Sequence, residues 1–123
     1  MDKLSRAAQA LSDETRLRIL YLLTAKECCV CEVIQALDIS QTRASRNLKI
    51  LEDAGFLDMR TEGLYTLYSV RETDGNGFYT DLLNAVKSAM RNNAVARKDV
   101  DRLQQSKRVG PGCTTEVVCS SRS

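Results

Sequence analysis

Apolar residues in the first half of the chain recur every three or four positions, with polar residues between them. This spacing is typical of helices that bury one face. Ser12 and Ser40 can cap the second and fourth of these helices, and Gly55 suits a left-handed stop after the fourth. The predicted helices cover residues 3–10, 13–23, 30–37 and 40–54.

The pattern changes after Gly55. Residues 56–60 and 64–70 read as two strands around the turn Thr61-Glu62-Gly63, and residues 78–92 form a last long helix. Helix, helix, short turn, helix and hairpin is the order of a winged helix-turn-helix, so the predicted fold is mainly α with a small β-hairpin. Residues 1–92 are expected to form this domain. Residues 93–123 are more polar and are expected to form a flexible, cysteine-containing tail.

The amino-acid composition excludes several classes of function. The 123 residues suffice for one domain with a modest core, and a net charge of +2 means that nucleic-acid binding needs a local basic patch. No apolar run is long enough for a membrane span or a signal peptide, so a cytoplasmic protein without a membrane partner is expected. The absence of histidine excludes Ser-His and Cys-His nucleophile pairs. With no glycine-rich cofactor loop either, we expect neither an enzyme nor an organic cofactor.

The fourth predicted helix carries the basic patch. Its segment from Ser40 to Lys49 contains three basic residues and no acidic one, while Ala44, Leu48 and Leu51 form its inner face. The start of a recognition helix is the part that reaches base edges. Alone, the arginines would suit a solvated helix face; the turn and hairpin around them favour DNA binding. The candidate contacts are Ser40, Gln41, Thr42, Arg43, Ser45, Arg46 and Lys49, with Arg60 on the hairpin.

Three of the five cysteines, Cys28, Cys29 and Cys31, fall within four residues. Clustered thiols in a reducing compartment suit a soft metal ion or thiol redox chemistry. Residues two apart on a helix point about 200° apart, so Cys29 and Cys31 can converge only if Cys29 caps the helix and its first turn opens. The helix N-terminus is expected to lower the pKa of these thiols.

Three segments together resemble the ArsR/SmtB family of metal-responsive repressors. They are the opening helix motif of residues 11–20, the Cys29-Val30-Cys31-Glu32-Val33 box and the recognition helix of residues 40–51. The resemblance implies a homodimer formed by the first and last helices. It also implies binding to an inverted repeat of operator DNA and release when metal binds. The third cysteine of the family's arsenic-type box falls at Ile34, which cannot be a ligand.

Trivalent arsenic or antimony is the inducer expected from this cysteine set, because such an ion takes three thiolates in a pyramid. The last predicted helix lacks the histidines of the family's zinc sites. Cys28 is the nearest third ligand and is preferred, while Cys113 or Cys119 could instead come from the tail of either subunit. The alternatives are a redox- or persulfide-responsive repressor of the same fold and, less favoured, a thiol-based metal carrier.

Overall fold

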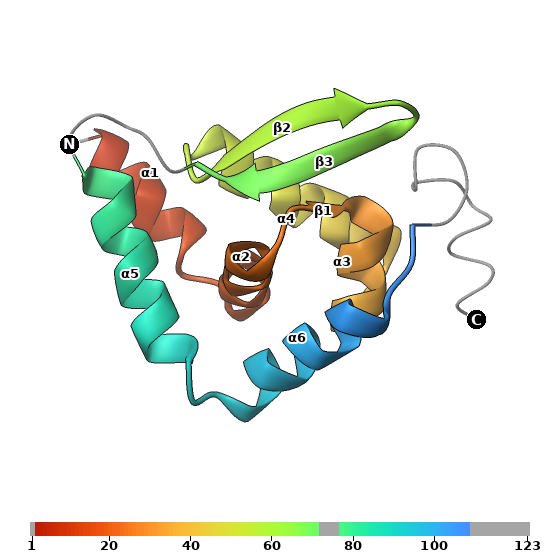
Figure 1. Cartoon of the computed structure of the whole chain (residues 1–123). Helices are drawn as coiled ribbons and strands as arrows, with labels where there is room; N and C mark the ends of the chain where they lie inside the picture. Colours follow the sequence, from red (N-terminus) through yellow and green to blue (C-terminus); the bar gives the residue numbers. More distant parts are fainter. Residues whose placement is uncertain (1, 72–76, 109–123) are drawn as a thin grey trace.

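The computed structural model describes residues 2–71 and 77–108 (Figure 1). Within these ranges it contains six helices and one three-stranded sheet. The first elements are α1 (Asp2–Ala10), α2 (Glu14–Ala25), β1 (Cys28–Cys29), α3 (Val30–Leu37) and α4 (Gln41–Asp53). They are followed by β2 (Leu57–Glu62), β3 (Tyr65–Val70), α5 (Phe78–Met90) and α6 (Ala94–Gln105). The helix-turn-helix and hairpin predicted from the sequence are therefore present.

Helix α2 lies at the centre of the helices in Figure 1, and it packs against α3, α4, α5, α6 and β3. Its Ile19, Leu20 and Leu22 are fully buried and join a core to which the flanking helices contribute. The β2–β3 hairpin extends from this helical body along one side of the molecule (Figure 1). In the described part of the chain, no helix is long and apolar enough to cross a membrane.

The sheet contains a strand that the sequence analysis did not predict. Strand β1 pairs antiparallel with β3, so that Cys28 lies opposite Tyr68 and Cys29 opposite Leu67. Strand β3 also pairs with β2, which gives the order β1-β3-β2. Two residues are too few to show an alternating pattern in a sequence. The pairing joins the cysteine segment directly to the hairpin.

Of two predictions about helix ends, the cap of α2 is wrong and the stop after α4 is confirmed. Helix α2 is capped by Asp13, whose carboxylate accepts from the backbone N–H of Arg16 at 3.1 Å, and the predicted cap Ser12 instead donates to the carbonyl of Gln9. The left-handed stop at Gly55 is present, with φ of +99°. A Cβ at Gly55 would collide with the hydroxyl of Tyr79, so glycine is required by both backbone and packing.

The tail boundary predicted at residue 93 is wrong, because residues 94–105 form α6. Asn93 caps this helix, and its buried Ala96 and Leu103 face α2 and α3. Asp99 is also buried and receives two hydrogen bonds of 2.8 Å from the guanidinium of Arg18 on α2. This paired carboxylate explains how a polar sequence packs against the domain. The rest of the predicted tail, residues 109–123, lies outside the described residues.

Candidate thiol site and nucleic-acid interface

Cys29 and Cys31 meet at the N-terminus of α3. Cys29 is the N-cap residue, with extended backbone (φ −90°, ψ 170°), whereas Cys31 lies in the first helical turn. Their sulfur atoms are 3.0 Å apart, and both residues are fully buried. The extended cap turns the Cys29 side chain toward its neighbour. The predicted convergence at the cap is confirmed, but the first turn does not have to open for it.

Cys28 does not join this pair. Neighbouring residues of a strand point to opposite faces of a sheet, so Cys28 and Cys29 diverge. Cys28 packs in the main core and its Sγ lies 3.3 Å from the carbonyl oxygen of Lys26, whereas Cys29 and Cys31 pack around Leu67 of β3. The preference for Cys28 as third ligand does not fit this arrangement. No group of three potential ligands converges within the described residues, and Cys113 and Cys119 lie outside them.

Burial keeps the thiols of Cys28 and Cys29 protonated. It raises the pKa of Cys29 to about 11. A backbone hydrogen bond lowers this pKa, whereas the negative charge of Glu32 raises it further. Burial raises the pKa of Cys28 to about 12. The expectation that the helix N-terminus would give low-pKa thiols is therefore wrong for these two residues. Desolvation of a thiolate outweighs the favourable end of the helix.

Glu32 links the thiol pair to its surroundings. Its buried carboxylate accepts from the backbone N–H of Cys29 at 2.9 Å and from Nε of Arg108 at 3.0 Å, and it lies 3.0 Å from Nζ of Lys26. Burial opposes ionisation of Glu32, but these three donors outweigh it and lower the pKa of the carboxyl group. The sequence analysis treated Glu32 only as part of a motif. Its position three residues after a cap is the signal that could have identified it.

The chain beyond α6 runs beside the same sulfurs. Gln35 donates to the backbone carbonyl of Lys107 at 2.6 Å and accepts from its N–H at 3.1 Å. The same carbonyl lies 3.7 Å from Sγ of Cys31. With the Arg108–Glu32 contact, these bonds hold residues 106–108 against α3. We call residues 106–108 the strap.

Helix α4 presents the predicted DNA contacts on one surface. Ser40 caps it by accepting from the backbone N–H of Arg43 at 3.1 Å. Ala44, Leu48 and Leu51 are buried as predicted. Exposed or half-buried positions are taken by Ser40, Gln41, Thr42, Arg43, Ser45, Arg46 and Lys49.

Two residues that the sequence analysis missed orient α4. Buried Asn47 accepts from Nη1 of Arg16 at 3.1 Å and donates to the backbone carbonyl of Arg43 at 3.0 Å. Thr15 accepts from Nη2 of Arg43 at 2.7 Å. Helix α2 therefore holds the recognition helix through polar bonds as well as apolar packing. A polar residue on the otherwise apolar face of α4 is the signal that marks Asn47.

Arg60 is placed on β2, as predicted, but it is paired with acidic residues. Its guanidinium donates to both carboxylate oxygens of Glu27 at 2.7 and 2.8 Å, and to Glu62 at 3.1 Å. Glu27 immediately precedes β1. The Arg60–Glu27 pair therefore connects the hairpin to the segment that carries the cysteines. It also neutralises the positive charge of Arg60, which was expected to contact DNA phosphate.

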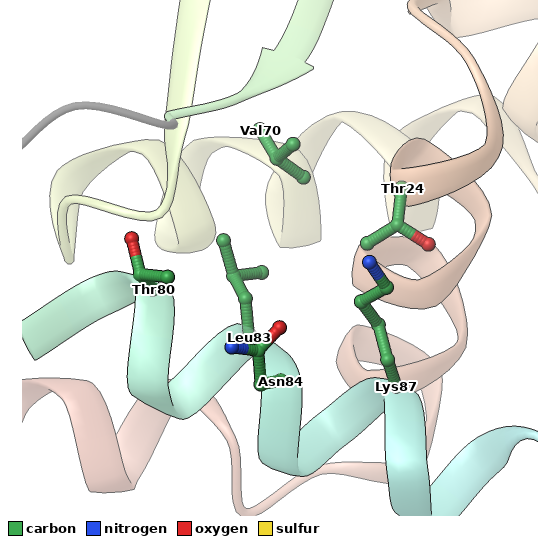
Figure 2. Close-up of a pocket in the computed structure, with 6 residues that line it drawn as sticks. All are labelled: Thr24, Val70, Thr80, Leu83, Asn84 and Lys87. Carbon is green, nitrogen blue, oxygen red and sulfur yellow. The ribbon is translucent and has the colours of Figure 1, made fainter. Parts of the chain in front are cut away.

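A separate pocket of about 260 Å³ opens between α2, β3 and α5 (Figure 2). In this view Leu83 points from α5 toward Val70 of β3, and Lys87 lies near Thr24 of α2. Its lining residues are Thr24, Val70, Thr80, Leu83, Asn84 and Lys87. None of the residues predicted to bind metal or DNA lines it.

Comparisons with known proteins agree with this arrangement. The family described as bacterial regulatory protein, arsR family, matches residues 13–58. The arsenical resistance operon repressor of Bacillus subtilis (strain 168) is 32% identical over 82 residues, which are 66% of this chain and 78% of the repressor. The repressor of the same name from Escherichia coli (strain K12) is 46% identical over 59 residues, or 47% of this chain and 50% of the repressor.

A solved structure extends the similarity to the fold. It is a homodimeric winged helix-turn-helix DNA-binding domain from Mycobacterium bovis, and it superposes with a TM-score of 0.63 at 29% identity. The superposition covers 76% of this chain and 82% of the other. The predicted fold class is therefore confirmed.

Proposed function

Because the chain belongs to the arsR family of bacterial regulatory proteins, we propose that it is a transcriptional repressor released from operator DNA by trivalent arsenic or antimony. The observation that carries the proposal is the pair of sulfur atoms, 3.0 Å apart, at the N-cap of α3. Helix α3 packs against α4. A ligand that binds both sulfurs would therefore act on the support of the recognition helix.

The chemistry of the donors favours a soft ion with a preference for sulfur. Soft thiolates select soft ions, and the chain has no histidine to build a mixed site. Neutral arsenious acid also suits protonated thiols, because its hydroxyl groups leave as water with the thiol protons. A divalent cation would instead have to displace those protons into solvent.

Two routes lead from the sulfurs to the DNA surface. Cys29 caps α3, which packs on α4, and the same residue is paired through β1 with β3 of the hairpin. A ligand can shift an equilibrium only if it binds one conformation better than the other. We expect the ligand to favour a conformation in which α3 and β1 no longer hold α4 and the hairpin in their DNA-binding positions.

The DNA partner is expected to be an inverted repeat bound by a homodimer. A two-fold dimer presents its recognition helices to two related half-sites. The similarity to a homodimeric domain supports this assembly for the present chain. We expect α1 and α5 at the interface. Lys3 of α1 already lies over the rings of Phe78 and Tyr79 of α5, at 4.7 and 5.2 Å from their centroids.

The test combines DNA binding with arsenite titration. Duplexes selected from a random pool by reduced protein supply the operator, and fluorescence anisotropy then follows its release by arsenite. Wild-type protein should release DNA, whereas Cys29→Ser should bind DNA normally and fail to respond. Cys28→Ala is the matched control, because it removes a neighbouring buried thiol that lies on the opposite face, and it should respond like wild type.

Three results would contradict the proposal. A normal arsenite response in Cys29→Ser would exclude the thiol pair as the sensing site. Release by oxidants but not by arsenite would replace the inducer with thiol oxidation. Tight arsenite binding by a protein that selects no duplex from the pool would indicate a metal carrier.

A further inference from the structure

A second pocket adjoins the one drawn in Figure 2. It has a volume of about 210 Å³ and lies between α2, the end of α5 and α6, and both pockets are lined by Thr24 and Lys87. We call the two pockets together the α2–α5 cleft. We propose that this cleft binds a small organic anion. Its oxyanion group is held by Lys87 and Arg91, and its apolar body lies against Leu83.

The positive charge of the cleft is not compensated by a carboxylate in its lining. Lys87 lies in the last turn of α5 and Arg91 is the C-cap of this helix, so the two side chains, four residues apart, leave the same side of it. Among the described residues, no aspartate or glutamate lines either pocket. Neither cation forms an ion pair within residues 2–71 and 77–108. Both can therefore donate charge-assisted hydrogen bonds to an oxyanion.

The larger pocket combines apolar and neutral polar side chains. Val70 and Leu83 present methyl groups, whereas Thr80 and Asn84 present groups that can donate hydrogen bonds. In Figure 2, Leu83 points toward Val70, and the side chain of Lys87 extends from α5 toward α2. An apolar lining with a few polar groups is typical of sites for small molecules. An inorganic ion would leave the apolar wall without contacts, so the lining favours an organic anion.

The cleft lies away from the side of α5 expected to meet a second subunit. The polar residues of α5 that line the cleft recur every three or four positions and are Thr80, Asn84, Lys87 and Arg91. A stripe of apolar residues that are half-buried or exposed consists of Phe78, Leu82, Ala85 and Ala89. Because successive residues of a helix are about 100° apart, the two sets lie on opposite sides of α5. A partner packed on the apolar stripe therefore leaves the cleft open.

The elements around the cleft connect it to the DNA-binding surface. Helix α2 holds α4 through the bonds from Arg43 to Thr15 and from Arg16 to Asn47, and β3 belongs to the hairpin. The cleft is thus present in the conformation in which α2 holds the recognition helix. Resting on the proposed function, we expect an anion that binds this conformation to stabilise it, to tighten operator binding and to oppose release by arsenite.

Binding is tested with three probes of similar size, which are benzoate, phenyl phosphate and the neutral benzamide. Reduced full-length protein is titrated with each at constant ionic strength and without arsenite, and ¹H–¹⁵N NMR identifies the amides that respond. The two anions should shift the signals of Thr24, Asn84 and Lys87 most, and benzamide should bind about tenfold more weakly. The tighter anion identifies the oxyanion as a carboxylate or a phosphate. Equal affinity for benzamide, or shifts confined to other parts of the chain, would overturn the site.

Two variants separate charge from shape. Lys87→Gln should weaken binding of both anions about tenfold and leave benzamide unaffected. Its control is Lys98→Gln, at an exposed lysine of α6 that lines neither pocket. Asn84→Phe places a ring in the larger pocket from an exposed position and should abolish anion binding without a change of charge, whereas Gln104→Phe, on the exposed side of α6, should not. Wild-type anion affinity in Lys87→Gln or in Asn84→Phe would overturn the site.

A different role for the cations is tested by unfolding in urea without a probe. Positive charge at the carboxyl end of a helix stabilises the helix itself. A lower free energy of unfolding in Lys87→Gln, with unchanged anion affinity, would assign Lys87 to that role and overturn the site. Equal losses of anion affinity in Lys87→Gln and Lys98→Gln would show that general positive charge attracts the probes, and would also overturn it.

The effect on DNA is measured by operator titrations with and without the tighter anion. Wild type should bind the operator about fivefold more tightly in its presence, and Asn84→Phe should not respond. An anion that binds in the cleft without changing operator affinity would overturn its role as an effector. Lys87→Gln should still release DNA with arsenite. Failure of arsenite to release DNA from wild type would overturn the proposed function, while binding of the probes would still support the cleft.

Discussion

Helices α3 and α4 start in contrasting ways. The cap of α3 is Cys29, fully buried, with its backbone N–H bonded to buried Glu32. The cap of α4 is Ser40, exposed, with its side chain bonded to the N–H of Arg43. A hydroxyl cap is chemically inert, whereas a sulfur cap can exchange its proton for a soft ion. Under the proposed function, α3 would respond to the inducer and α4 would contact the operator DNA.

The pH dependence of cadmium and arsenite binding tests the protonation of the α3 cap, and it is the largest effect that we expect. Because the pKa of Cys29 is about 11, this thiol is protonated throughout pH 6–8. Affinity for cadmium should rise about tenfold per pH unit for each thiol that loses its proton, hence about 100-fold per thiol over this range. Arsenite affinity should stay nearly constant, since thiol protons leave as water. Competition titrations at several pH values measure both. A cadmium affinity that stays constant, or an arsenite affinity that falls steeply as the pH rises, would contradict the high pKa.

The reading role of α4 is tested at the exposed face after its cap. Arg46→Ala should weaken operator binding about ten- to hundredfold and reduce the slope of log affinity against log salt, because contacts to bases or phosphates are lost. Arg97→Ala is the control, since Arg97 is an exposed arginine on α6. Anisotropy titrations at several salt concentrations make the measurement. Equal losses in the two variants would mean that general positive charge, and not α4, binds DNA.

Glu32→Gln breaks the α3 cap without touching a sulfur. It removes a buried charge shared by Lys26, Arg108 and the N–H of Cys29, and should lower the free energy of unfolding by about 1–3 kcal/mol at pH 7. Because the folded-state pKa of Glu32 is lowered, its contribution is complete above the unfolded-state value and is lost as pH falls through the folded-state value.

Urea unfolding at pH 7 and at acid pH checks this effect. The gap between wild type and Glu32→Gln should close as the pH falls below the ordinary range of a glutamate. Glu52→Gln, on the half-exposed side of α4, is the control and should change stability by less than about 0.5 kcal/mol. A gap that stays constant with pH would show that shape, and not charge, explains the role of Glu32.

An element of the fold could be predicted when it was long enough for its apolar residues to repeat at a helix or strand spacing. Helices α3 and α4 and the hairpin are predicted because their apolar residues repeat over several turns or alternations. Strand β1 has only two residues, and α6 buries a polar carboxylate, Asp99, whose partner Arg18 is 81 positions away in the sequence. Strand β1 therefore has no periodic signal, whereas α6 has a sparse one, Ala96, Val100 and Leu103, among mostly polar and charged residues.

The candidate site shows the same limit. The cysteine spacing predicts a thiol site, but the direction of each side chain depends on the β1–β3 pairing, which a local pattern does not contain. That pairing separates Cys28 from Cys29. The raised thiol pKa also depends on tertiary burial, which the helix N-terminus alone does not reveal.

The link between the hairpin and the segment that carries the cysteines gives the smallest expected effect. Glu27, just before β1, holds Arg60 of the hairpin in a bidentate pair, and this pairing lowers the pKa of Glu27. Glu27→Gln should free part of the Arg60 charge for phosphate and tighten operator binding about two- to fivefold in the absence of arsenite. It should also reduce the weakening of DNA binding by arsenite, because one of the contacts that join the β1 segment to the hairpin is lost, while the β1–β3 pairing remains.

Asp58→Asn is the matched variant for this link. Asp58 pairs with Arg71 at 3.0 Å, and it lies on β2, which is not paired with β1 in the sheet. Its substitution raises the net charge by the same amount as Glu27→Gln. Operator titrations with and without arsenite compare the two. A larger gain in affinity and a smaller arsenite effect in Glu27→Gln alone would assign the coupling to the Glu27–Arg60 pair. Equal gains in affinity would show that net charge, and not the Glu27–Arg60 pair, explains the tighter binding, because both variants remove one carboxylate beside an arginine.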